Sequence, residues 1–200
     1  MSTADTLKHV GIYSPAFHAA LEHVLRFEGG YSDHADDPGG KTYKGITIGL
    51  LRQWRNAPVT EAELRAITPE EVYQIYHQLF WKAIRGDELR PDLASQMFDA
   101  AVNSGPKNSV LALQRAINGL KIGIGKLMED GRLGGKTITA ANAVKPELLT
   151  REYYIRRLLF YGLLKTFRSF GLGWLRRAVA GYELSQKLLA AAKAVNAALN

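Results

Sequence analysis

The 200-residue sequence contains no cysteine, which excludes disulfide bonds, thiolate metal sites and a cysteine nucleophile. It also contains no run of about 18 uncharged apolar residues, the length that a membrane-spanning helix needs. Its first eight residues, MSTADTLK, lack the apolar stretch of a secretory signal peptide. The composition, 46% hydrophobic and 22% charged, is typical of a chain that folds without covalent cross-links. We therefore expect a soluble protein that is made in the cytoplasm.

The net charge of +7 is distributed unevenly along the chain. Residues 1–104 contain 10 Lys and Arg against 14 Asp and Glu, whereas residues 105–200 contain 16 against 5. The second half therefore carries the whole positive excess. A basic half of this kind favours binding to an anionic partner, which could be nucleic acid, anionic lipid or a cell-wall polymer.

The pattern of apolar and capping residues predicts a mostly α-helical fold. Ser14-Pro15 marks the start of a first helix, and Thr60 and Thr68 each begin a capping-box sequence. Between residues 29 and 50 the chain is rich in Gly and Asp, which indicates a long loop with a small β-hairpin over residues 42–48. From residue 174 onward we expect one or two Ala- and Leu-rich helices with a break near Gly181.

Glu28 is the strongest candidate for a catalytic residue. The apolar positions Phe17, Leu21 and Val24 continue by their own spacing to Glu28, which places its carboxyl on the buried side of the last helical turn. Desolvation and the negative end of the helix dipole would both raise the pKa of a carboxyl at this place. A carboxyl that keeps its proton near neutral pH can act as a general acid in glycosidic cleavage. The alternative is that Glu28 is a solvated helix-end residue beside a glycine cap.

The segment that begins at Glu28 resembles a known family of enzymes. Glu28-Gly29-Gly30-Tyr31, followed by Asp37-Pro38-Gly39-Gly40, Thr42 and Gly45-Ile46-Thr47, is similar to the N-acetylmuramidases of glycoside hydrolase family 108. These are lysozyme-like enzymes of phages and prophages that cut peptidoglycan. The resemblance extends through Asp99, Asn103 and Gly173-Trp174-Leu175-Arg176-Arg177, and so covers about residues 15–178.

The resemblance implies a lysozyme-like helical fold in three parts. Residues 1–104 would form the catalytic part, residues 105–180 a peptidoglycan-binding-like helical part packed on it, and residues 181–200 an Ala-rich C-terminal helix. Glu28 falls on the family's catalytic glutamate, and Asp37 is the first choice for a second carboxylate that activates water or stabilises an oxocarbenium-like centre. Asp33, Asp36 and Asp99 remain alternatives, and an Asp before Pro-Gly-Gly also commonly begins a turn.

Several other residues are candidates for binding sugar. Gln96, Asp99 and Asn103 share one face of a predicted helix, which would be solvated surface or the polar lining of a glycan groove. Tyr31 and Tyr43 could stack on sugar rings, and Thr47 could orient water or substrate or simply stabilise the hairpin. For Trp81, packing in the core is the better interpretation.

No cofactor or metal is expected, because the histidines and carboxylates show no ligand spacing and the glycines form no phosphate or dinucleotide motif. The expected activity is hydrolysis of the β-1,4 bond between N-acetylmuramic acid and N-acetylglucosamine in peptidoglycan strands. The alternatives are a lytic transglycosylase at the same site and a non-enzymatic protein that binds nucleic acid or the wall. We expect no nucleic-acid partner, because no such motif is present. The enzyme would reach the wall after release by a holin, by lysis or by another export route.

The basic helices near the C-terminus could also contact an anionic membrane surface. The residues concerned are Arg151, Arg156, Arg157, Arg168, Arg176 and Arg177.

Overall fold

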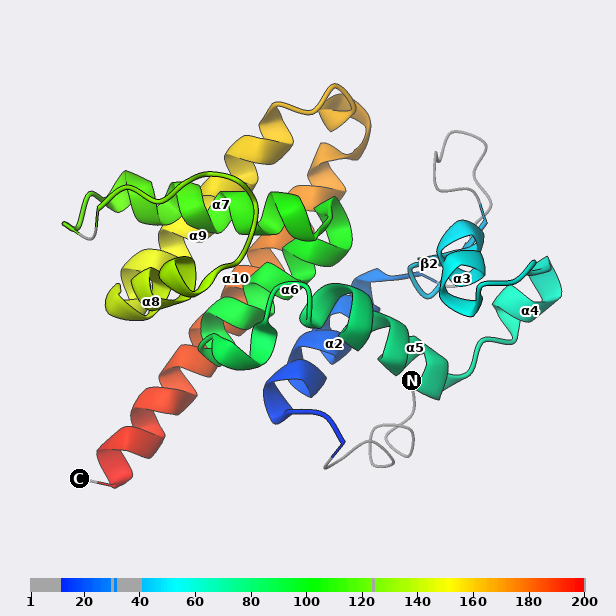
Figure 1. Ribbon diagram of the computed structural model, residues 1–200, viewed down its shortest axis with the longest axis horizontal. Helices are drawn as coiled ribbons and strands as arrows, with labels where there is room; N and C mark the ends of the chain where they lie inside the picture. Colours follow the sequence, from blue (N-terminus) through cyan, green and yellow to red (C-terminus); the bar gives the residue numbers. More distant parts are fainter. Residues whose placement is uncertain (1–11, 30, 32–40, 124, 200) are drawn as a thin grey trace.

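The computed structural model describes residues 12–29, 31, 41–123 and 125–199, and these residues form a mostly helical molecule with one small sheet (Figure 1). The predicted fold class is therefore confirmed. In the described part of the chain, no helix is both long and apolar enough to cross a membrane. The elements are α2 (Pro15–Phe27), β1 (Thr42–Tyr43), β2 (Ile46–Thr47), α3 (Ile48–Arg55), α4 (Glu61–Arg65), α5 (Pro69–Tyr76), the π-helical turn η1 (His77–Trp81), the 3-10 turn η2 (Gly86–Glu88), α6 (Pro91–Ser104), α7 (Pro106–Leu120), α8 (Gly135–Ala143), α9 (Pro146–Gly162) and α10 (Phe167–Ala198).

Local sequence signals set the starts of the N-terminal helices. The Ser14 hydroxyl accepts a hydrogen bond from the Phe17 amide at the start of α2, directly before the proline at its first position. Thr60 and Glu63 form a complete capping box on α4, and Thr68 caps α5. Each cap satisfies amide groups that the first helical turn leaves unpaired.

The expected hairpin is present. Strands β1 and β2 are antiparallel, with Thr42 opposite Thr47 and Tyr43 opposite Ile46. The two turn residues between them, Lys44 and Gly45, both have positive φ angles, of 50° and 73°. This is the pattern of a type I′ turn, whose twist matches that of the two strands.

Helix α6 lies at the centre of the molecule and packs against α2, α7, α9 and α10 (Figure 1). Its Phe98 joins Phe17 of α2 and Trp81 of η1 in an aromatic cluster with ring centroids 5.5 to 5.7 Å apart. All three side chains are fully buried, so Trp81 is a core residue as expected. This cluster fixes the helix that carries Glu28 onto the central helix.

Helix α10 differs from the prediction. It runs without a break from Phe167 to Ala198, and Gly181 is a buried residue inside it. The predicted break near Gly181 is therefore wrong, and the predicted boundary between residues 180 and 181 falls within one helix. Arg177 before this glycine and Ser185 after it both form hydrogen bonds with α6, which holds α10 in place on both sides of Gly181.

Candidate active site

Glu28 lies where helix α2 ends. Its amide still donates to the Val24 carbonyl, but its own backbone is extended, so the chain leaves the helix at this residue. The side chain is 16% exposed. The sequence therefore predicted its position at the last turn and its partial burial correctly.

The carboxylate of Glu28 is paired with an arginine that is distant in the sequence. Nη1 of Arg177, on α10, donates to Oε1 of Glu28 at 2.7 Å. Glu28 therefore has a charged partner on the side of α2 where the sequence indicated only burial. The sequence placed Arg177 among the basic residues and in the last stretch of the family resemblance, but gave it no role beside Glu28. No spacing could have linked two residues 149 positions apart.

The hairpin turn bounds the carboxylate on another side. A Cβ atom added to Gly45 would lie 2.6 Å from Oε2 of Glu28 and would also overlap the Tyr76 hydroxyl. That hydroxyl donates to the Lys44 carbonyl at 2.9 Å, which holds the turn in place. Burial, followed by the charge of Glu28, raises the pKa of Tyr76, so the phenol stays neutral. The glycine is thus required for the close approach of the hairpin to Glu28.

Asp99 is the central carboxylate of a buried charge network. Its Oδ1 accepts from Nε of Arg177 at 2.6 Å, and its Oδ2 lies 2.6 Å from Nη2 of Arg157 on α9. Burial opposes ionisation of Asp99, but the two guanidinium groups outweigh it and the pKa of Asp99 is lowered. Both oxygens of Asp99 are therefore occupied by arginines. A role for Asp99 as a catalytic base or as a sugar ligand would require these pairs to break.

The other two residues of the polar face predicted on α6, Gln96 and Asn103, also contact neighbouring helices. Gln96 is 1% exposed, and its Nε2 donates to Ser185 Oγ on α10 and to the Thr150 carbonyl on α9. Oδ1 of Asn103, which is partly exposed, accepts from the Tyr161 hydroxyl at 2.6 Å. This polar stripe of Gln96, Asp99 and Asn103 thus holds α6 against α9 and α10. Gln96 and Asp99 were expected to face solvent or a glycan, and that expectation is wrong for both.

The candidates near the hairpin have mainly structural contacts. Thr47, at the end of β2, caps α3 by accepting a hydrogen bond from the Leu50 amide. A role in orienting water or substrate stays a prediction for this residue. The Arg65 guanidinium stacks 3.4 Å above the centroid of the Tyr31 ring, which covers one face of it. Tyr43 is half-buried in β1. A role in sugar stacking stays a prediction for both tyrosines.

Asp37, Asp33 and Asp36 lie outside the described residues, so the identity of the second carboxylate remains a prediction. No group of three or more metal-ligating side chains occurs among the residues that the structure describes.

Half of the six basic residues predicted to meet a membrane surface are already engaged. Arg157 and Arg177 are buried in the charge network, and Arg156 is paired with Glu152 at 2.8 Å. The three that remain exposed are Arg151, Arg168 and Arg176.

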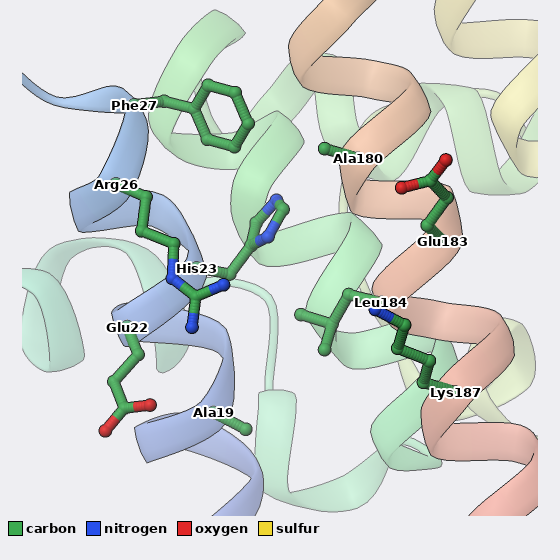
Figure 2. A pocket seen from close by; sticks show the side chains of 9 residues that line it. All are labelled: Ala19, Glu22, His23, Arg26, Phe27, Ala180, Glu183, Leu184 and Lys187. Atoms are coloured by element: carbon green, nitrogen blue, oxygen red, sulfur yellow. The ribbon is translucent and has the colours of Figure 1, made fainter.

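A pocket of about 260 Å³ lies between α2 and α10, close to the charge network. Figure 2 shows the His23 ring between the two helices. His23 is 7% exposed, and its Nε2 has no hydrogen-bond partner among the described residues. The remaining lining residues are Ala19, Glu22, Arg26, Phe27, Ala180, Glu183, Leu184 and Lys187.

Comparison with known proteins assigns the family. The family model described as Glycosyl hydrolase 108 matches residues 21–105, which include Glu28 and the hairpin. The solved structure of SagA from Brucella abortus is similar to this chain, with 33% sequence identity and a TM-score of 0.75. The match covers 87% of this chain and 94% of SagA. No curated protein matches the chain. The chain therefore belongs to the glycosyl hydrolase 108 family and is a glycoside hydrolase that acts on peptidoglycan.

Proposed function

We propose that the protein is an N-acetylmuramidase. It hydrolyses the β-1,4 bond between N-acetylmuramic acid and N-acetylglucosamine, and Glu28 protonates the leaving oxygen. Water then adds to C1 of the muramic acid and leaves a new reducing end. Asp37, nine residues after Glu28, is the proposed partner that activates this water or stabilises the positive charge at C1. The basic second half of the chain would bring the enzyme to the anionic wall after its release from the cytoplasm.

The observation that carries this proposal is the way Glu28 is held. Arg177 binds one carboxylate oxygen, Oε1, and the other, Oε2, faces the Gly45 turn. A general acid must place one oxygen within hydrogen-bonding reach of the leaving group, and a carboxyl that is fixed through its second oxygen meets this requirement. The side chain also remains partly exposed to solvent.

A lytic transglycosylase at the same site is the second candidate. In that reaction the C6 hydroxyl of the muramic acid attacks C1, so a single carboxyl suffices. The engagement of Asp99 by two arginines favours this alternative, because it removes one residue that could have activated water. Products of the two reactions differ by one molecule of water.

Digestion of purified sacculi tests the proposed function. We expect mass spectrometry to find fragments with reducing muramic acid ends, and the Glu28→Gln variant to release fragments about 10³-fold more slowly. Glu22→Gln is the matched control, because Glu22 is an exposed residue of the same helix. Anhydro ends would instead establish the transglycosylase, and wild-type rates for Glu28→Gln would remove Glu28 from the reaction.

A further inference from the structure

The buried charge network joins α10, which lies beyond the residues that the family model matches, to Glu28, the proposed catalytic residue. Arg177 uses two different nitrogens, Nη1 toward Glu28 and Nε toward Asp99. Its side chain is 9% exposed and that of Asp99 is 0% exposed. A guanidinium is a rigid planar fork, so a bond at one edge fixes the direction of the others.

Asp99 is itself held in place from a third helix. Arg157 of α9 contacts the second oxygen of Asp99, and Nε of Arg157 donates to the Tyr161 hydroxyl at 2.6 Å. That hydroxyl in turn donates to Asn103 on α6. The chain of contacts therefore runs from α9 and α6 through Asp99 to Arg177, and ends at Glu28.

The charges in this network balance. Two arginines face two carboxylates, Asp99 and Glu28, and burial makes any unpaired charge among them costly. Burial disfavours the charged form of Arg177, but Asp99 and then Glu28 outweigh it, and the pKa of Arg177 is raised. The guanidinium is therefore a permanent positive charge beside the Glu28 carboxylate.

We propose that Arg177 is a positioning residue for Glu28, anchored by Asp99, so that helix α10 completes the active site. The proposal rests on the proposed role of Glu28 as the general acid. It assigns to the helices after residue 105 a part in catalysis that is separate from attachment to the wall. Arg177 acts through Glu28, because it holds Oε1 and thereby fixes the direction of Oε2, which lies beside the Gly45 turn.

The test compares Arg177→Met and Arg177→Lys with Arg176→Met, a control at the adjacent exposed position. We expect Arg177→Met to lower kcat about 100-fold, since small displacements of a catalytic group cost about this much. KM and adsorption to sacculi should stay within roughly threefold of the wild type, because Arg177 holds Glu28 and not the glycan. Arg177→Lys should be intermediate, since one ammonium keeps the charge but cannot reproduce the two-sided fork.

The pH profile separates positioning from simple structural support. Loss of the guanidinium makes a negative charge at Glu28 more costly, so we expect the profile of kcat for Arg177→Met to move to higher pH. A variant that was only less stable would lose activity without this movement. Circular dichroism at the assay temperature establishes that each variant is folded.

Two outcomes would overturn the proposed role of Arg177. Wild-type kcat and an unmoved pH profile in folded Arg177→Met would overturn it. If that variant does not fold, the same result for Arg177→Lys would overturn it. Failure of the proposed function is recognised separately, because Glu28→Gln would then remain active whatever Arg177 does.

Discussion

At the scale of single residues, two features place Glu28. Its side chain is partly buried at the end of α2, and Arg177 donates to its Oε1 at 2.7 Å. The sequence indicated only the burial, because burial follows from helical periodicity. The contact with Arg177 depends on how α10 packs, which no spacing in the sequence indicates.

His23 provides a prediction at the same scale. Desolvation lowers its pKa from the ordinary value of 6.5, and the charges of Arg177, Arg157 and Arg26 add to this effect while Asp99 opposes it. The unfolded chain therefore binds a proton at His23 at a higher pH than the folded chain does. We expect the free energy of unfolding to fall as the pH is lowered from 6.5 toward the depressed pKa.

Urea unfolding at a series of pH values measures this effect. His23→Gln has no proton to take up in this range, so its stability should fall less steeply than that of the wild type. Parallel curves for the two proteins would show that His23 does not contribute.

At the scale of elements, the hairpin turn determines how closely the sheet approaches α2. Gly45→Ala places a methyl group against the Glu28 carboxylate and the Tyr76 hydroxyl at a positive φ angle. We expect a loss of about 2 kcal/mol in the free energy of unfolding, from backbone strain and from displaced neighbours. The rate of sacculus digestion should fall more than about tenfold, because Glu28 must move.

Gly49→Ala in α3 is the control for this substitution. Its nearest new contact is 3.8 Å away, so it should preserve activity and raise stability by up to about 1 kcal/mol. Equal behaviour of the two variants in thermal unfolding and digestion would contradict the role given to Gly45.

Elements with local signals were predictable from the sequence. Ser14, Thr60 and Thr68 begin helices as their sequences indicate, and the hairpin forms within residues 42–48 as predicted. The environment of the α6 stripe was not predictable, because an isolated helix with Gln96 and Asp99 on one face looks the same whether water, glycan or other helices meet it. Only the packing of α9 and α10 decides between these surroundings.

At the scale of the whole molecule, α6 contacts both the N-terminal α2 and the later helices α7, α9 and α10. The ion pair from Arg177 to Glu28 crosses the same division. We therefore expect the predicted catalytic part and the helical part that follows it to unfold as one cooperative unit. Calorimetry should give a single transition whose calorimetric and van't Hoff enthalpies agree. Two separate transitions would instead support independent domains.

The order in which the chain is synthesised gives the Arg177 contact a further consequence. A ribosome completes Glu28 and the hairpin long before it adds Arg177, so a nascent or prematurely terminated polypeptide contains the glutamate without its arginine. Under the proposed role of Arg177, such incomplete products are poor hydrolases. Full activity would then require synthesis to continue through Arg177 of α10.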